Sequence, residues 1–320
     1  MQNASTKNFP FTKPFAAPNR LIDESSRQEA LFAKPVCAVR TLSEIAGQLF
    51  FLRGDVSPSR NKFVILLDSD HWKDPRNPSN FPLYMRRLGL IGQTGFQLAV
   101  PGKTVTPPPQ TALLSCSEKR RKEFAGTFPV LPWKLGIGES VRELVKAGLL
   151  PEADAAKNRF RSDTGEIVLD SENTTFLVST PRSEGMVLEK DRALEGTFAG
   201  VRNSDTFAGF LVASLDGKIL KESSRLLILH LTRIANTGET YRDADCNILE
   251  SRGHSPLLLR RGKAVMTLQR NFQGFRLYAM DPNGTRLSEC PFRTENGKTI
   301  LELDNSRNGR AVLAYELTRQ

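Results

Sequence analysis

Residues 207–233 read FAGFLVASLDGKILKESSRLLILHLTR, and this stretch sets the expectation for the fold. Apolar side chains dominate its two ends, 207–214 and 225–233, and an Asp216-Gly217 turn signal lies between them. This pattern predicts two β-strands. A period of two places His230 on the face opposite three leucines, where a lone histidine is more often a packing or surface residue than a catalyst.

The same pattern extends over residues 151–320, which contain about nine short strand candidates separated by turn signals. Asp281-Pro-Asn-Gly284, Asn296-Gly297 and Asn308-Gly309 are glycine-bearing turns of the kind that joins antiparallel strands. We therefore expect an antiparallel β-sandwich over 151–320. The strand candidates are 167–170, 175–180, 197–202, 207–214, 225–233, 264–270, 275–280, 299–303 and 311–317.

Upstream of residue 150 the pattern changes to an alternation of strands and helices. Phe63-Val-Ile-Leu-Leu67 is a short apolar run typical of a buried parallel strand. A capping box, Thr41-Leu-Ser-Glu44, opens an amphipathic helix that we expect to reach Leu52. The expectation is a small α/β layer domain over 39–150, beginning with that helix and preceded by an irregular arm over 1–38. Further helices are predicted at 83–91, 117–124 and 140–150, and a strand at 96–100.

Charge and composition argue against several classes of protein. Lys+Arg 45 and Asp+Glu 35 give a net charge of +10, and residues 1–150, with 21 basic and 12 acidic side chains, carry +9 of it. The densest basic run, 118–123, is bracketed by acids and lacks interleaved aromatics, so we do not expect a nucleic-acid partner. No stretch approaches the roughly 18 apolar residues of a membrane helix. No signal peptide is expected within this chain, and its localisation is left open.

Short catalytic and cofactor motifs are not found. The four cysteines form no Cys-x-x-Cys pair, and only three histidines are present. The chain contains no P-loop, no Gly-x-Gly-x-x-Gly opening a helix, no Gly-x-Ser-x-Gly and no His-Glu-x-x-His. We therefore expect neither a metal nor a cofactor. Paired carboxylates leave no short motif, so glycoside hydrolysis by two acids about 5 to 9 Å apart stays open.

Candidate site residues follow from position. Asp68 and Asp70 come directly after the predicted buried strand, where α/β sheets place ligands, and Asp55 lies at the end of the first helix. Ordinary turn chemistry is the simpler explanation of Asp68 and Asp70, because Asp-Ser-Asp precedes a proline-rich loop. Arg182 and Glu184 flank a turn after a strand, where they either face a ligand or pair with each other. Among the aromatic residues, Tyr241 and Tyr278 are candidates for contacting a sugar.

Several blocks of the sequence resemble one known architecture. Leu49-Phe-Phe-Leu-Arg-Gly-Asp-Val-Ser-Pro58 resembles the junction that follows the catalytic barrel in large bacterial glycoside hydrolase-like proteins, of the barrel clan that includes family 42 β-galactosidases. Residues 161–168, 176–185, 210–217 and 226–238 resemble, in the same order, the β-rich carboxyl-terminal region of those proteins.

The resemblance implies that the catalytic domain lies outside this chain. In such proteins the catalytic carboxylates are carried by a (β/α)₈ barrel of at least about 200 residues, whereas only about 40 residues precede the first helix. No catalytic residue can be carried over. The leading hypothesis is a non-catalytic accessory segment, used for scaffolding or docking in polysaccharide degradation, whose partner is a catalytic barrel domain or chain. The alternatives are a stand-alone glycoside hydrolase and a carbohydrate-binding module with a polysaccharide ligand.

The leading hypothesis makes a structural prediction about the junction helix. If a barrel normally covers the helix from Thr41 to Leu52, its apolar face should have no cover within this chain. Complete burial of the helix against residues 60–320 would contradict the hypothesis.

Overall fold

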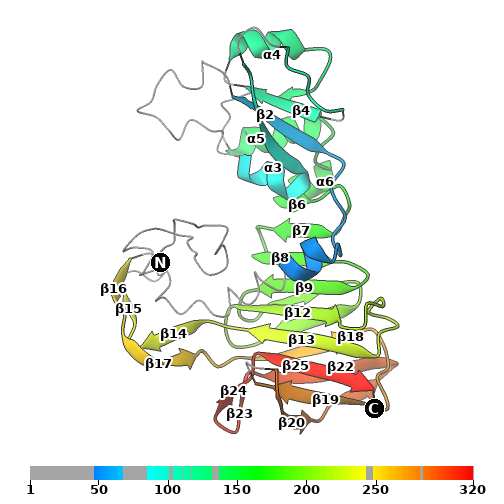
Figure 1. Ribbon diagram of the computed structural model, residues 1–320, viewed down its shortest axis with the longest axis vertical. Helices are drawn as coiled ribbons and strands as arrows, with labels where there is room; N and C mark the ends of the chain where they lie inside the picture. Colours follow the sequence, from blue (N-terminus) through cyan, green and yellow to red (C-terminus); the bar gives the residue numbers. More distant parts are fainter. Residues whose placement is uncertain are drawn as a thin grey trace. The chain divides into compact units, whose positions relative to one another are not determined.

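A computed structural model of the chain describes residues 47–67, 85–100, 104–109, 111–115, 117–131, 137–242, 248–281 and 284–319. Within these residues the chain divides into two compact units (Figure 1). Unit 1 comprises residues 47–55 and 179–319, and unit 2 comprises 56–178. The division expected at residue 150 thus falls inside unit 2.

Unit 2 is built on a small parallel sheet with strand order β3-β2-β4-β5. Its central strand β2 carries the predicted run: Phe63 and Ile65 face one core, and Val64 and Leu66 face another. Helices α3 and α5 contribute Leu88, Ile91 and Leu144 to the first core, and α4 contributes Phe124 to the second. The strands are β2 (Lys62–Leu67), β3 (Gln93–Leu98), β4 (Thr111–Ser115) and β5 (Val130–Leu131), and the helices are α3 (Met85–Ile91), α4 (Glu118–Phe124) and α5 (Ile137–Lys146).

The start of α4 agrees with the sequence prediction, whereas the start of α5 does not. Helix α4 lies within the predicted range 117–124, and Ser117 caps it, because its hydroxyl accepts from the Arg120 amide. Helix α5 begins at Ile137, three residues before the start predicted at residue 140. A short helix, α6 (Glu152–Ala155), and an antiparallel meander complete the unit: β6 (Arg159–Arg161), β7 (Ile167–Asp170) and β8 (Thr175–Ser179), whose last residue lies in unit 1.

Unit 1 contains two larger antiparallel sheets. One has the strand order β10-β11-β18-β22-β21, and the other contains six strands of this unit in the order β20-β19-β25-β13-β12-β9. The stretch 207–233 supplies two neighbours of the second sheet, β12 and β13, with Phe210 opposite His230. The strands are β9 (Ser183–Leu188), β10 (Ala193–Glu195), β11 (Ala199–Asn203), β12 (Ala208–Ser214), β13 (Arg225–Leu231), β18 (Lys263–Leu268), β19 (Phe275–Met280), β20 (Arg286–Cys290), β21 (Arg293–Glu295), β22 (Lys298–Asp304) and β25 (Ala314–Arg319).

Strands of both sheets show the alternating burial that predicted them. In β18 and β22 every second side chain is buried, including Met266 and Leu301, and in β19 the buried side chains include Leu277. The hydroxyl of Tyr315 on β25 donates to the carbonyl of Asp304 on β22 at 2.7 Å and accepts from its amide at 3.0 Å. The described residues are therefore strand-rich, with several antiparallel sheets and one small parallel sheet.

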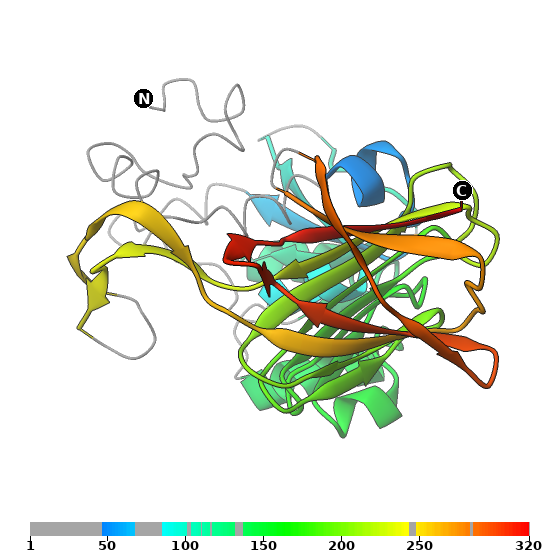
Figure 2. The ribbon, with the colours of Figure 1, turned by 90° about the horizontal axis from the view of Figure 1, so that it is seen from below.

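Three small ribbons project from these sheets. The longest, β14 (Ile234–Thr237) with β17 (His254–Leu259), extends away from the two larger sheets of unit 1 together with β15 (Thr240–Tyr241) and β16 (Leu249–Ser251), in yellow in Figure 2. The third is the hairpin β23 (Ser306–Arg307) and β24 (Arg310–Ala311). Its predicted Asn308-Gly309 turn has positive φ at both residues, which asparagine and glycine tolerate best.

The junction helix η1 (Gly47–Leu52) is described from residue 47, so its predicted capping box at 41–44 lies outside the described residues. Leu49 and Phe50 pack against a buried cluster on β12 and β13 that includes Leu211 and Leu229. Gly185 lies beneath this contact, because a Cβ there would approach the Phe50 ring to 3.4 Å. Phe51 and Leu52 are 82% and 70% exposed. The expected absence of cover within the chain is therefore wrong for Leu49 and Phe50, whereas Phe51 and Leu52 are exposed; the complete burial that would contradict the accessory-segment hypothesis is not seen either.

Candidate functional site

Asp55 lies in a closed network of donors in unit 1. Arg53 binds its carboxylate through two nitrogens, at 2.9 Å to Oδ1 and 2.6 Å to Oδ2. Arg182 is 2.9 Å from Oδ1, and the Ser183 hydroxyl donates to Oδ2 at 2.8 Å. A carboxylate has about four acceptor positions, and these contacts fill all four in a side chain with no exposed surface. Asp55 has no position left for a substrate proton.

The guanidinium of Arg182 is engaged in the same network. Besides Asp55, it donates to the carbonyls of Arg53 and Gly54 at 3.0 and 3.3 Å. It joins the segment after η1 to the start of β9. The sequence left open whether Arg182 faces a ligand or pairs with Glu184; within the described residues its partners are Asp55 and this backbone.

Glu184 is also buried and fully bound. Its carboxylate accepts from the amides of Thr197, Phe198 and Ala199 at 2.7 to 3.1 Å and from the Ser179 hydroxyl at 2.5 Å. Gly196 permits this approach, because a Cβ there would lie 2.5 Å from Oε2. A pocket of about 310 Å³ adjoins the carboxylate, with apolar walls that include Phe198 and Leu220. Three backbone donors make Glu184 the anchor of the β10–β11 turn.

Each candidate tyrosine has a guanidinium against its ring. Arg286 lies 4.3 Å from the Tyr278 ring centroid, and its Nε donates to the buried Glu316 at 2.6 Å. Arg233 lies 5.0 Å from the Tyr241 ring centroid. Both rings are half-buried, so neither is an open stacking platform. Asp68 and Asp70 lie outside the described residues.

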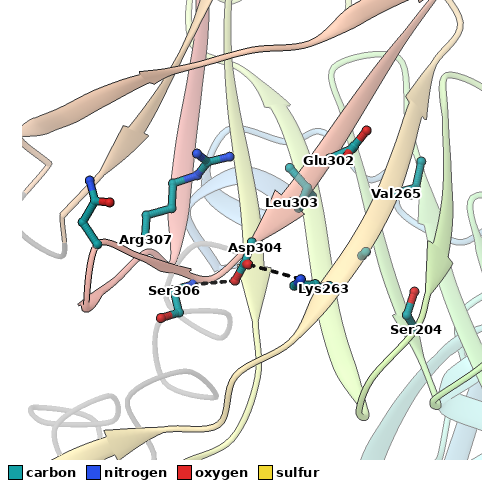
Figure 3. Close-up of a pocket in the computed structure, with 10 residues that line it drawn as sticks. Ser204, Lys263, Val265, Glu302, Leu303, Asp304, Ser306 and Arg307 are labelled. Carbon is teal, nitrogen blue, oxygen red and sulfur yellow. Dashed lines mark hydrogen bonds and ion pairs between the residues drawn. The ribbon is translucent and has the colours of Figure 1, made fainter.

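A different region of unit 1 forms a second pocket, whose lining is largely polar. It encloses about 510 Å³ on the sheet that contains β18 and β22 and is bounded by the β23–β24 hairpin (Figure 3). Lys263 and Asp304 face each other across the two strands, and Val265 faces Glu302 one pair along. Figure 3 shows Asp304 between Ser306 and Lys263. The pocket is lined by Ser204, Lys263, Ala264, Val265, Glu302, Leu303, Asp304, Ser306, Arg307 and Asn308.

The Asp304 carboxylate is held in place but not saturated. Arg261 donates to Oδ1 at 3.3 Å and to Oδ2 at 2.6 Å, and the Ser306 amide donates to Oδ1 at 3.1 Å. The Lys263 ammonium is 3.9 Å from Oδ2, which is too long for a hydrogen bond. Partial burial raises the pKa of Asp304, but the Arg261 and Ser306 hydrogen bonds outweigh it and leave the pKa below its ordinary value. Asp304 is therefore an ionised acceptor.

These pocket residues carry no signal in the sequence that singles them out. Lys263 and Asp304 occupy outward positions of alternating strands, where charged residues are expected on any solvated sheet face. The Asn308-Gly309 signal predicted the hairpin that bounds the pocket. The pairing of Lys263 with Asp304 depends on a register between strands whose paired residues are 31 to 41 positions apart in the sequence, and no local pattern encodes it.

His230 is a buried side chain stacked on Phe210, with ring centroids 4.8 Å apart. Neither ring nitrogen has a hydrogen-bond partner within the part of the chain that the structure describes. Desolvation lowers the pKa of His230 to about 4, against the opposing fields of Asp304 and Asp205. The packing interpretation of this histidine, left open beside a surface position in the sequence, is the one the structure supports.

No protein-family model, curated protein or solved structure matches this chain. Among the described residues, no group of three or more His, Cys, Asp or Glu side chains is placed to hold a metal ion. None of the helices in the same residues is both long and apolar enough to traverse a bilayer.

Proposed function

We propose that the chain is a non-catalytic accessory segment of a glycoside hydrolase-like protein, and that the two larger sheets of unit 1 form its β-sandwich. The alternating burial of β18, β19 and β22 supports the sandwich, as does the Tyr315 hydroxyl, which joins β25 to β22.

One observation carries the functional proposal. The candidate carboxylates that the structure describes, Asp55 and Glu184, are buried and each is bound by at least three donors. A glycosidase needs one carboxylate to carry a proton and another to face the anomeric carbon or a water. Neither residue meets this requirement.

The docking role is supported by η1. This helix buries Leu49 and Phe50 on the sheet but leaves Phe51 and Leu52 exposed. In the resembling proteins the matching segment follows the catalytic barrel. We propose that a (β/α)₈ barrel covers Phe51 and Leu52, either from the same polypeptide or from a neighbouring chain.

The first test is a hydrolysis assay of the purified chain on aryl α- and β-glycosides and on plant and algal polysaccharides. We expect no turnover. Turnover that is lost in Asp68→Asn or Asp70→Asn would overturn the proposal and establish a stand-alone hydrolase.

The second test addresses docking. The chain is mixed with the isolated (β/α)₈ barrel domain of a family 42-like glycoside hydrolase, and the complex is measured by size-exclusion chromatography with light scattering. We expect a complex that Phe51→Asp with Leu52→Asp weakens at least tenfold. Phe207→Asp, which changes an exposed phenylalanine elsewhere in unit 1, is the matched control. Equal complex formation by all variants, or none by the unaltered chain, would contradict docking through η1.

A further inference from the structure

The pocket between β18, β22 and the β23–β24 hairpin has the size of a ligand site. Its volume of about 510 Å³ is within the range of about 300 to 1,000 Å³ that small-molecule sites occupy. All of its lining residues belong to unit 1, in two neighbouring strands, a short hairpin and Ser204 on the opposite wall. The hairpin is fixed to the sheet by the Ser306 amide, which donates to Asp304.

The charges of the lining select against a charged ligand. Lys263 and Arg307 contribute two positive charges, and Glu302 and Asp304 contribute two negative charges. Arg261, the partner of Asp304, adds a cation at the edge, and Arg293 neutralises Glu302 at 2.8 Å. An anionic ligand would be attracted by Lys263 and repelled by Asp304. A cationic ligand would be attracted by Asp304 and repelled by Lys263. A neutral ligand with many polar groups avoids both costs.

The geometry at Asp304 favours hydroxyl groups. Within the described residues, three donors occupy three of its four acceptor positions, so Oδ2 can accept one more hydrogen bond. The Lys263 ammonium, 58% exposed, has donors to spare. One hydroxyl can donate to Oδ2 while its neighbour accepts from Lys263, so a pair of adjacent hydroxyls would bridge the 3.9 Å gap. Val265 supplies an apolar surface beside this pair.

We propose that this pocket binds a neutral saccharide unit, with Asp304 and Lys263 as the hydroxyl-binding pair. The proposal rests on the proposed function in one respect, because an accessory segment in polysaccharide degradation would meet saccharide chains. It goes beyond that function by placing a ligand-binding site on the segment itself, away from the η1 surface.

The test is affinity electrophoresis of the full chain in native gels that contain hydroxyethyl cellulose, laminarin, galactomannan or agarose, with alginate and carrageenan as anionic comparisons. We expect retardation by at least one neutral polymer and none by the anionic polymers. Asp304→Asn and Lys263→Met should each raise the dissociation constant at least tenfold. Glu195→Gln and Lys298→Met, on the same sheet outside the pocket lining, are the matched controls and should leave it unchanged.

A third variant separates binding from structural effects. Ser204→Trp fills the pocket from its opposite wall and leaves the Asp304 contacts in place, because Ser204 bonds to the sheet through its backbone amide. It should abolish retardation while the near-ultraviolet circular dichroism changes only by the added tryptophan. Retardation that survives Ser204→Trp, retardation by the anionic polymers, or no retardation in any neutral gel would overturn the proposal. None of these outcomes bears on the barrel-docking test, so the two failures are distinguishable.

Discussion

Asp55 and Asp304 are both aspartates of unit 1 that lie beside two cations, yet their surroundings differ. Asp55 has all four acceptor positions filled and no exposed surface, whereas Asp304 has three filled, is 22% exposed and lines a pocket. Each carboxylate accepts three hydrogen bonds, and the difference is the fourth contact, which is Arg182 at 2.9 Å from Asp55 but Lys263 at 3.9 Å from Asp304. It separates a carboxylate that holds the fold together from one that can accept a hydrogen bond from a ligand.

The largest effect is expected from Asp55→Asn. Removing the charge leaves Arg53 and Arg182 facing a neutral amide that donates where the carboxylate accepted. Loss of one partner from a buried ion pair costs about 3 to 5 kcal/mol, and the partial exposure of both arginines places the expected cost near the lower end. The loss of unfolding free energy is measured by urea denaturation, with hydrogen exchange of the amides in residues 183–231 as the signal. A loss below about 1 kcal/mol would show that Asp55 is not the anchor described above.

The next-largest effect on stability is expected from the protonation of His230. This side chain is buried like Asp55, and the charge of Asp304 acts on it. Its pKa is about 4 in the folded chain and about 6.5 in the unfolded chain, so the unfolded chain binds the extra proton between these values. Stability is therefore complete above about pH 6.5 and falls as the pH drops towards 4, by about 3 kcal/mol in total.

Unfolding titrations at a series of pH values measure this loss. His230→Phe, which keeps the stack on Phe210, should remove most of the slope between pH 6.5 and 4. His254→Gln is the control, because it removes an exposed histidine and leaves the core unchanged. Carboxylates with lowered pKa values, such as Glu316, lose their contribution at lower pH, outside this window. Identical slopes in the two variants would contradict the assignment.

The comparison of Asp55 with Asp304 also shows which features of the structure the sequence could predict. Strong apolar patterns predicted β2, β12, β13 and β19 closely, because each strand buries a regular set of its own side chains. Strand β9 was not predicted, and a turn was expected up to Gly185. Its first residues are buried polar side chains whose partners lie far away in the chain, with Ser183 bonded to Asp55 and Glu184 to the 197–199 amides.

Candidate sites were harder to predict for the same reason. Position along the chain singled out Asp55, Arg182 and Glu184, and the structure shows that each has a partner distant in the sequence: Arg182 pairs with Asp55, and Glu184 accepts from the Thr197 amide. Lys263 and Asp304 carried no signal, because outward charges on a strand look alike until the register of β18 and β22 pairs them. A local pattern predicts on which face of a strand a side chain lies, but not which residue of a distant strand pairs with it.

Glu184→Gln is expected to lower stability by an intermediate amount. The Glu184 carboxylate is buried like that of Asp55, but it is bound by backbone amides instead of arginines. A glutamine offers one oxygen to three amides and turns its own amide nitrogen towards them, which leaves buried donors unpaired. The expected cost is about 2 kcal/mol. Hydrogen exchange of the 197–199 amides should accelerate before that of the strand amides, and the exposed Glu222→Gln variant should show neither change. Unchanged protection of 197–199 would contradict the anchoring role.

The smallest effect on stability, and the most informative, is expected from Asp304→Asn. Arg261 and Lys263 are 61% and 58% exposed, so solvent screens both, and their pairing with Asp304 contributes within about 1 kcal/mol. The same variant should bind neutral polysaccharide at least tenfold more weakly, because the amide nitrogen donates where one hydroxyl would have to donate. Urea denaturation and affinity electrophoresis on one preparation measure both quantities. A stability loss as large as that of Asp55→Asn, with unchanged retardation, would mean that Asp304 stabilises the sheet and the pocket binds through other residues. A small loss of stability with a large loss of binding is the combination that an unsaturated carboxylate at the edge of a pocket produces and a saturated one in the core cannot.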